Sequence, residues 1–287
     1  MSASTDVRAI PFAKMEAVGN DFVVVKEMDI RQGEESALAQ EMCSRRFGIG
    51  SDGLLVLGAS DRADLRVRMF NPDGTEDHCG NGMRCAVLMG LEPLTTGQER
   101  DLTLETIAGL KRTRLYWIGG EPSITTDMGE PAFHPSALPM SVDVERVVDY
   151  PIEVEGETLP VTVVSTGTTH AVLFAEDAQI AEQFERISPA LERHPLFPER
   201  TSVLWATLKD SDMIHLRIWE RGVGETLGCG TGACAAMIAA RLRKAVGNRA
   251  MVVSPGGALE VFWPGEGSCT LTGGARVVYR GVWGGRI

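Results

Sequence analysis

Two cysteines stand in the same local setting, each immediately before a Gly-x-Gly turn that leads into an apolar run. Cys79 opens CGNGMRC, and Cys229 opens CGTGAC, which continues into AAMIAARL. The glycines favour a functional interpretation of both, because they let the backbone approach a ligand closely. A cysteine elsewhere is usually a small buried residue, and we interpret the other four in that way: Cys43, Cys85, Cys234 and Cys269.

The runs that follow both cysteines are rich in helix formers, with apolar residues spaced for a buried stripe. We therefore expect each thiol to precede a helix, the second of which would end near residue 246 with Gly247 as its C-cap. The first N–H groups of a helix favour an anion, which suits both a substrate carboxylate and a thiolate.

Two thiols at two helix starts predict a specific chemistry. Inverting the α-carbon of an amino acid requires a base on one face and an acid on the other, and a thiolate and a thiol can fill these roles. The helix N–H groups would stabilise the charge that develops on the carboxylate. The scheme requires neither a metal nor pyridoxal, and the sequence offers no HExxH motif and no closely spaced Cys/His ligand pairs.

Internal similarity suggests two halves of similar plan. An offset of 150 residues aligns the two cysteines and also pairs four other positions: Gly74 with Gly224, Gly80 with Gly230, Gly82 with Gly232, and Ala86 with Ala236. A second offset of 148 pairs Gly19 with Gly167. Short apolar runs such as GLLVLGA, LRVRMF, PVTVVST and IHLRIWE indicate strands. The predicted class is α+β, with many strands and one principal helix in each half.

Composition narrows the classes of partner. The 287 residues, 44% of them hydrophobic, are enough for about two domains with a sizeable core. The formal charge of -11 disfavours nucleic acid. We expect no membrane association, because no signal core or long apolar run is present. We also expect a cytoplasmic location in which the thiols are reduced. GIGSDG, residues 48–53, matches a dinucleotide-binding pattern, but a strand-like run follows it where that fingerprint needs a helix.

Several motifs, in order, resemble the diaminopimelate epimerase family over almost the whole chain: MEAVGNDFVVV, RRFGIGSDGLLVL, NPDGTEDHCGNGMRC, DMGEP, LFPER and ERGVGETLGCGTGACAA. The resemblance implies two pseudo-symmetric domains, each a curled sheet around a central helix, with the active site in the cleft between them. One domain would comprise residues 1–119 plus 275–287, and the other residues 120–274. The resemblance also implies a role in lysine biosynthesis and an amino acid as the substrate. It is compatible with a homodimer.

By the same resemblance, Cys79 and Cys229 match the family's acid/base pair, and His170 and Glu220 match residues that assist them. On residue type alone, His170 would be a structural histidine, and Glu220 with Arg221 a solvated pair. The substrate-binding residues carried over complete the predicted site: Gly80, Asn81, Gly230 and Thr231 for the reacting carboxylate, Asn20 in the same pocket, and Asn71, Thr168, Ser202 and Arg221 towards the distal end.

The chain departs from the family pattern at the distal end. Thr168 and Ser202 stand where the family has asparagine, so two amide groups are replaced by shorter hydroxyls. KMEA replaces KMHG at residues 14–17, and the segment from Asn71 to Cys79 is one residue shorter. LL- and meso-diaminopimelate is the leading substrate, and a different amino acid is the alternative. A thiol redox protein or a non-catalytic binding protein remains open, although the chain lacks the Cys-x-x-Cys pair typical of thiol redox proteins.

Overall fold

The computed structural model describes residues 9–93 and 96–284, and its chain divides into two compact units. Unit 1 comprises the described residues up to Thr126 together with those from Gly274 onwards, and unit 2 comprises Asp127–Gly273. The first boundary falls seven residues after the position expected from the sequence. The reason is that β8 (Glu121–Gly129) begins by pairing with β7 (Gly109–Ile118), so its first half belongs to unit 1.

Unit 1 is a sheet with two α-helices. Its remaining elements are β1 (Ile10–Ala17), β2 (Asn20–Lys26), the 3-10 helix η1 (Glu27–Asp29), α1 (Glu35–Met42), β3 (Gly53–Gly58), β4 (Leu65–Phe70), β5 (Glu76–Asp77), α2 (Gly80–Gly90), β6 (Arg100–Thr106) and β18 (Arg276–Trp283). The strands follow the order β18, β1, β2, β3, β4, β6, β7, β8. The pairs β2–β3 and β4–β6 are parallel and the others are antiparallel, while the short β5 pairs with β4.

Unit 2 repeats this plan. Its elements are η2 (Pro135–Ala137), β9 (Tyr150–Val154), β10 (Glu157–Ser165), β11 (Thr169–Phe174), α3 (Asp177–Glu192), β12 (Ser202–Asp210), β13 (Met213–Glu220), β14 (Gly224–Thr226), α4 (Gly230–Leu242), β15 (Arg249–Ser254), β16 (Gly257–Phe262) and β17 (Cys269–Gly273). The strand order is β9, β10, β11, β12, β13, β15, β16, β17, with β11–β12 and β13–β15 parallel.

Each step of unit 1 therefore has its counterpart in unit 2, and the predicted repeat is confirmed. The hairpin β1–β2 corresponds to β10–β11, and the crossover that contains α2 corresponds to the one that contains α4. Both hairpin turns use a glycine in the left-handed region, Gly19 at φ 79° and Gly167 at φ 102°. A side chain is strained at that φ, which explains why the two glycines recur at the same place in the repeat.

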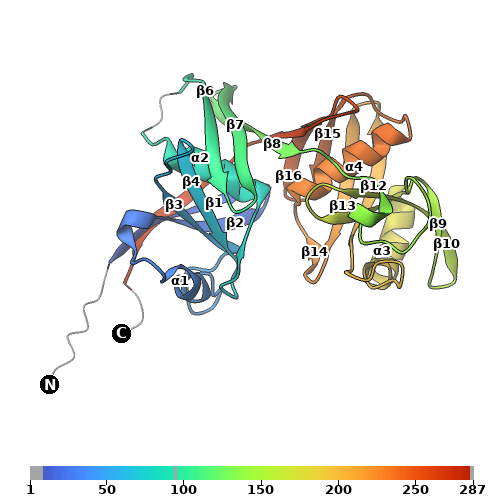
Figure 1. Ribbon diagram of the computed structural model, residues 1–287, viewed down its shortest axis with the longest axis horizontal. Coiled ribbons are helices and arrows are strands. Elements are labelled where there is room, and N and C mark those ends of the chain that lie inside the picture. The colour runs from blue at the N-terminus through green and yellow to red at the C-terminus, as the bar shows by residue number, and fades with distance from the viewer. Residues whose placement is uncertain (1–8, 94–95, 285–287) are drawn as a thin grey trace. The chain divides into compact units, whose positions relative to one another are not determined.

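A buried helix lies at the centre of each unit, as expected. In α2 every residue from Gly80 to Leu88 is buried, and α4 is buried from Gly232 to Ala240. A helix that is covered on all sides must be enclosed by other elements. Accordingly, α4 packs against seven strands, β10–β13 and β15–β17, and its alanines leave room for them. Figure 1 shows α4 running alongside the strands of unit 2. The predicted mixed class and the curled sheet around a central helix are confirmed.

Two details of the helices differ from expectation. Each unit contains a second helix, α1 or α3, which the prediction of one principal helix per half omitted. In α3 the apolar stripe Ile180, Phe184, Ile187 and Leu191 packs into the same core as Trp205. The helix α4 also ends at Leu242 rather than near 246, because Lys244 adopts φ 61° and stops the helix; Gly247 is not the C-cap.

Within the described ranges, no helix combines the length and the apolarity that crossing a bilayer requires.

Candidate active site

Cys79 occupies the N-cap of α2, so the prediction that this thiol precedes a helix is confirmed. Its sulfur donates to the amide Oδ1 of Asn20, with 3.4 Å between the two atoms. The amide Nδ2 of Asn81 donates to the same oxygen across 3.3 Å. Thus Cys79, Gly80, Asn81 and Asn20 form one group in unit 1, which we call the Cys79 cluster.

Asn20 is held in place by Asp52, an acid that is not among the site residues predicted from the sequence. Its amide Nδ2 donates to Oδ2 of Asp52 across 2.6 Å. Because the carboxylate oxygen of Asp52 accepts this hydrogen bond from an N–H donor, the contact turns the nitrogen of Asn20 towards Asp52 and leaves the oxygen facing Cys79. The orientation of the amide therefore follows from its hydrogen-bond network.

Asp52 in turn belongs to a network of charges. Arg45 bridges Asp52 and Asp21, at 2.6 Å and 2.8 Å, and the buried Lys14 ammonium lies 2.6 Å from Asp21 and also donates to the carbonyl of Gly50. Burial acts to raise the pKa of Asp21, but the hydrogen bonds and charges of Arg45 and Lys14 outweigh it and lower that pKa to about 2. Asp21 is therefore ionised at neutral pH, and the network supports Asn20 through its hydrogen bond to Asp52.

The start of α2 is arranged to receive an anion. Its first intrahelical bond runs from Met83 N to Cys79 O, so the N–H groups of residues 80–82 precede it and point out of the helix start. Asn81 is 3% exposed, and its Oδ1 accepts from Arg84 Nη2 at 2.8 Å. A carboxylate placed here would meet backbone donors and the positive end of the helix dipole.

Cys229 occupies the equivalent N-cap of α4, which confirms the second predicted helix start. Its sulfur accepts from Gly232 N at 3.3 Å and lies 3.3 Å from the hydroxyl of Thr231. The carbonyl of Thr231 accepts from the hydroxyl of Thr166 at 2.9 Å, which ties the helix start to the end of β10. Cys229, Gly230 and Thr231 form the Cys229 cluster of unit 2.

His170 lies on β11 of the same unit and is buried. Its Nε2 is 3.0 Å from the hydroxyl of Thr168, and its Nδ1 has no hydrogen-bond partner among the described residues. Burial, with a smaller contribution from the positive charge of Arg221, lowers the pKa of His170 to about 3. The imidazole is consequently neutral across the physiological range, so it can orient or relay a proton but carries no charge.

Glu220 and Arg221 lie at the end of β13, where the chain makes a tight turn. Oε1 of Glu220 accepts from the hydroxyl of Thr226 at 2.5 Å. The backbone N of Arg221 donates to the hydroxyl of Ser202 at 3.1 Å, and Arg221 Nη1 donates to the carbonyl of Glu199 at 3.2 Å. Ser202 is thus in direct contact with Arg221, and the parallel pairing of β11 with β12 sets it opposite His170.

Asn71 follows β4 in unit 1. Its amide nitrogen donates to the hydroxyl of Thr75 at 3.1 Å and to the carboxylate of Asp77 at 3.3 Å. Asp77 stands two residues before Cys79, so Asn71 stiffens the segment that leads into α2. These contacts lie within that segment rather than in the Cys79 cluster.

Two acids that support these residues were missed in the sequence. Asp52 accepts a hydrogen bond from Asn20, which lies 32 positions away in the sequence. Glu192 accepts a hydrogen bond from the backbone N of Gly222, which lies 30 positions away. The available signal was an acidic residue beside an otherwise apolar element: Asp52 directly before GLLVL, and Glu192 at the end of the amphipathic α3. Neither signal identifies the partner.

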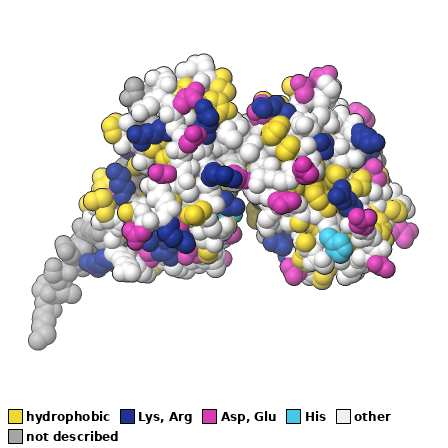
Figure 2. Space-filling view, turned by 45° about the horizontal axis from the view of Figure 1, so that its top comes forward, with side chains coloured by type: hydrophobic (Ala, Val, Ile, Leu, Met, Phe, Trp, Pro, Cys, Tyr) yellow, Lys and Arg dark blue, Asp and Glu magenta, His cyan; other side chains and the backbone are white. Residues whose placement is uncertain are grey.

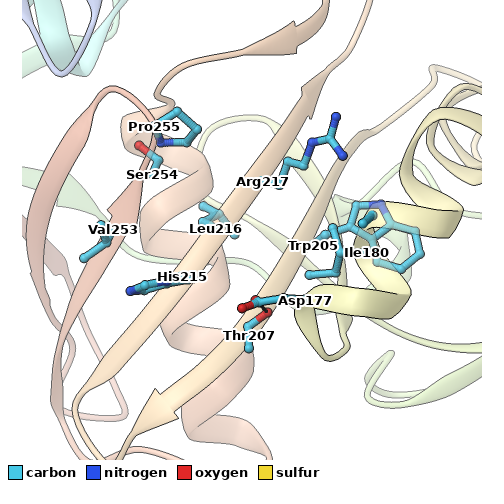
Figure 3. Close-up of a pocket in the computed structure, with 11 residues that line it drawn as sticks. Asp177, Ile180, Trp205, Thr207, His215, Leu216, Arg217, Val253, Ser254 and Pro255 are labelled. Atoms are coloured by element: carbon cyan, nitrogen blue, oxygen red, sulfur yellow. Dashed lines mark hydrogen bonds between the residues drawn. The ribbon is translucent and has the colours of Figure 1, made fainter.

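A separate pocket of about 360 Å³ opens in unit 2 beside α3, over β12, β13 and β15. Figure 3 shows Asp177 and Thr207 next to each other at its edge, and these two are hydrogen-bonded at 2.9 Å. Much of the lining is apolar, including Ile180, Trp205 and Leu216. Among the described residues that line it, none is a predicted site residue, so this pocket is distinct from the Cys229 cluster.

No group of three or more His, Cys, Asp or Glu side chains within residues 9–93 and 96–284 is placed to hold a metal ion.

Comparison with known proteins relates nearly the whole chain to one family. A family model described as "Diaminopimelate epimerase" matches residues 12–134 and 162–278. The diaminopimelate epimerase of Moorella thermoacetica is 42% identical over 275 residues, which cover 94% of this chain and 98% of that protein. The one of Desulfovibrio desulfuricans is 40% identical over 286 residues, which cover 96% and 98%.

Solved structures share the fold at much lower identity. A phenazine biosynthesis protein of the PhzF family from Bacillus anthracis has a TM-score of 0.70 at 20% identity, covering 96% of this chain and 99% of that one. A hydroxyproline epimerase from Agrobacterium vitis, solved with trans-4-hydroxy-L-proline, has a TM-score of 0.68 at 16% identity, covering 96% and 91%. At these identities the likeness shows the fold alone.

Proposed function

Because the chain belongs to the diaminopimelate epimerase family, we propose that it interconverts LL- and meso-diaminopimelate by inverting one α-carbon without a cofactor. The protein is then an isomerase. The observation that carries this proposal is the matched pair of N-cap cysteines, Cys79 on α2 and Cys229 on α4, at the same step of two repeated units. A single reactive thiol would not need this duplication, whereas a two-base reaction requires it.

In the proposed reaction, the thiolate of one cysteine removes the α-hydrogen as a proton, so a C–H bond breaks and an S–H bond forms. The electron pair of the broken bond spreads into the substrate carboxylate. The thiol of the other cysteine then gives its proton to the opposite face and becomes the thiolate. Reversing the reaction exchanges the two roles, so each cysteine serves as the base in one stereochemical direction.

The reacting carboxylate is proposed to bind at the two helix starts, against Gly80 and Asn81 on one side and Gly230 and Thr231 on the other. The N–H groups there are already oriented before the substrate arrives, so they stabilise the charge of the transition state with little reorganisation. Asn20 contributes its amide beside Cys79. His170, which is neutral, and Glu220 are proposed to assist the two sulfurs by orienting them and stabilising their protonation states.

The distal end of diaminopimelate is proposed to bind Asn71, Thr168, Ser202 and Arg221. The guanidinium of Arg221 can hold a carboxylate through two parallel hydrogen bonds. The hydroxyl oxygen of Ser202 already accepts from the backbone of Arg221, but its hydrogen can still be donated to a ligand. This side of the site consequently offers one strong anion contact and two hydroxyls.

A second candidate, racemisation of another amino acid, is favoured by one specific observation. The hydroxyl of Thr168 is engaged with His170 at 3.0 Å, so it is not simply a shortened replacement for the amide of asparagine. The part of the site that faces the distal end of the substrate then has fewer groups to bind a second ammonium and carboxylate than the family pattern supplies. The identity of the distal group is what separates the two candidates.

The test is solvent deuterium exchange into a panel of amino acids, with LL-diaminopimelate beside acidic, basic and aromatic members. We expect deuterium to enter one α-carbon of diaminopimelate together with inversion, as measured by mass spectrometry and chiral chromatography. Efficient exchange into another amino acid, with none into diaminopimelate, would reject the substrate and keep the two-cysteine mechanism. No exchange into any member would reject the mechanism.

We propose that the protein acts in the cytoplasm, where the reducing environment keeps both cysteines available for proton transfer. Nucleic acid is not a proposed partner. Figure 2 supports this, because on the face shown Lys and Arg side chains are interspersed with Asp and Glu in each unit.

We also propose a homodimer that pairs through β18, because this strand exposes three apolar side chains, Val278 at 53%, Tyr279 at 46% and Val282 at 64%. Light scattering after size-exclusion chromatography tests it. A molar mass of one chain at micromolar concentration would reject the dimer.

A further inference from the structure

Glu192 is an unusual residue for its position. It is the last residue of α3, and its carboxylate is 2% exposed. A carboxylate at the C-terminus of a helix faces the negative end of the helix dipole, and burying it removes its hydration. Such a residue is unfavourable unless specific partners compensate, so its partners indicate what it does.

The partners of Glu192 lie on both sides of the turn that carries Glu220 and Arg221. Oε2 accepts from the indole Nε1 of Trp219 at 2.8 Å, and Oε1 accepts from the backbone N of Gly222 at 2.9 Å. Burial acts to raise the pKa of Glu192, but these two N–H donors, helped by neighbouring arginines, lower it below its ordinary value. The carboxylate is therefore ionised and holds both donors at neutral pH.

The turn between those two donors is tight. The N–H of Val223 donates to the carbonyl of Glu220 at 3.0 Å, and Gly222 adopts φ 76°, in the left-handed region. A turn of this kind has no strand partner at Arg221 and Gly222, so its position depends on contacts from outside. Glu192 supplies the contact at Gly222.

The segment Glu199–Ser202 is joined to the same residue. The backbone N of Thr201 donates to the carbonyl of Glu192 at 3.2 Å, and the guanidinium of Arg200 lies 3.6 Å from its carboxylate. The segment then contacts Arg221 twice, through the Ser202 hydroxyl and the Glu199 carbonyl. Glu192 thus links the two segments that are proposed to recognise the distal end of the substrate.

We propose that Glu192 is a positioning residue: its carboxylate fixes the turn from Trp219 to Gly222 so that the Arg221 guanidinium is presented to the distal carboxylate of the substrate. The role of Arg221 rests on the proposed function, whereas the fixing of the turn does not. Without the carboxylate, the N–H groups of Trp219 and Gly222 lose their acceptor, and the turn can move away from Ser202.

The variant Glu192→Gln keeps the shape of the side chain but offers only one oxygen, so it turns an NH2 group towards one of the two donors. We expect the KM for diaminopimelate to rise by about tenfold, since an unsatisfied buried donor costs enough to displace the turn. The matched control is Glu185→Gln on the same helix, whose exposed carboxylate pairs with Arg217. It should leave the KM within about twofold.

Two further measurements separate positioning from a general loss of stability. If Glu192 acts through Arg221, the double variant E192Q/R221Q should resemble R221Q alone instead of showing the product of the two effects. The indole N–H resonance of Trp219, assigned with Trp219→Phe, should move in E192Q and stay in place in E185Q.

An unchanged Trp219 resonance together with a native KM in E192Q would overturn the proposal, as would fully multiplicative effects in the double variant. If the native protein turned over no diaminopimelate, the proposed function would fail, yet the Trp219 resonance would still decide whether Glu192 holds the turn. Should E192Q fail to fold, Trp219→Phe removes one of the two bonds alone and should give a smaller rise in KM.

Discussion

Asp52 accepts a hydrogen bond from the amide nitrogen of Asn20 across 2.6 Å, and this contact decides which end of the amide meets the sulfur of Cys79. With the oxygen of Asn20 facing the sulfur, the S–H form of Cys79 has an acceptor. With the nitrogen facing it, the thiolate would have a donor instead. Asp52, which is linked to the sulfur of Cys79 through two hydrogen bonds, therefore favours the S–H form of this thiol.

Asp52→Asn should weaken this bias, because an asparagine can donate as well as accept and lets the amide of Asn20 turn round. We expect faster alkylation of Cys79 by iodoacetamide at neutral pH and a fall in kcat of about tenfold. Peptide mass spectrometry measures the alkylation. Asp73→Asn, an exposed acid of the same unit, serves as the control. Equal alkylation of Cys79 in all three proteins would contradict the prediction.

Replacing either N-cap cysteine should stop inversion. In Cys79→Ala or Cys229→Ala one face of the α-carbon loses its acid or base, so we expect kcat for epimerisation to fall by about 10³-fold or more. Both variants should keep the native circular dichroism spectrum. Cys43→Ala, which changes a buried thiol of the core, should retain most of the activity. The two-base mechanism is wrong if both single variants remain fully active by chiral chromatography.

The activity should follow a bell-shaped pH profile, because the working pair needs one thiolate and one thiol, and the two apparent pKa values belong to the pair. Mild oxidation should silence the enzyme by joining Cys79 to Cys229, and a reductant should restore it. Initial rates across the pH range and non-reducing peptide mapping are the measurements. Indifference to both oxidants and thiol-alkylating reagents would be inconsistent with this chemistry.

The distal end can be tested by restoring the family pattern. Changing Thr168 and Ser202 together to Asn should increase the preference for diaminopimelate over other amino acids by about fivefold or more, since each recovered hydrogen bond contributes about 1 kcal/mol. The measurement is kcat/KM for diaminopimelate and for a panel of acidic, basic and aromatic amino acids. A fall in that preference would mean that the two hydroxyls serve the native substrate better than amides do.

His170 should make the fold sensitive to acid. Its pKa is lowered from 6.5 to about 3 in the folded protein. Below pH 6.5, His170 therefore binds a proton in the unfolded chain but stays neutral in the folded protein. The contribution of His170 to the free energy of unfolding is therefore fully present above pH 6.5 and is lost as the pH decreases towards 3. His170→Gln should reduce the slope of the unfolding free energy by up to about 1.4 kcal/mol per pH unit in this window. Urea titrations measure it, and equal slopes would show that His170 is not the group responsible.

The features that depend on residues adjacent in the sequence were predictable without the structure. Each cysteine was placed at a helix start from the glycines and helix formers beside it, and the strands were visible as short apolar runs. The end of α4 was not, because the left-handed Lys244 carries no glycine signal. The helix α3 was overlooked among its charged residues, although Ile180, Phe184 and Ile187 mark its buried face.

The supporting acids were not predictable, for a physical reason. A hydrogen bond between Asp52 and Asn20 depends on β2 and β3 being parallel neighbours, and one between Glu192 and Gly222 depends on where α3 ends over the sheet. Residue type and spacing do not contain these distances. The sequence therefore identified the groups proposed to touch the substrate, and the structure was needed to find what holds them.

The pairing of β1 with β18 has a consequence for how unit 1 folds. The two strands join residues 10–16 to residues 276–283, so the sheet of unit 1 is completed only when two segments separated by the whole of unit 2 meet. Unit 2 is continuous from Asp127 to Gly273, so its sheet forms from one uninterrupted stretch of chain. Until β18 pairs with it, β1 keeps an unpaired edge that a chaperone or a second unfolded chain can reach.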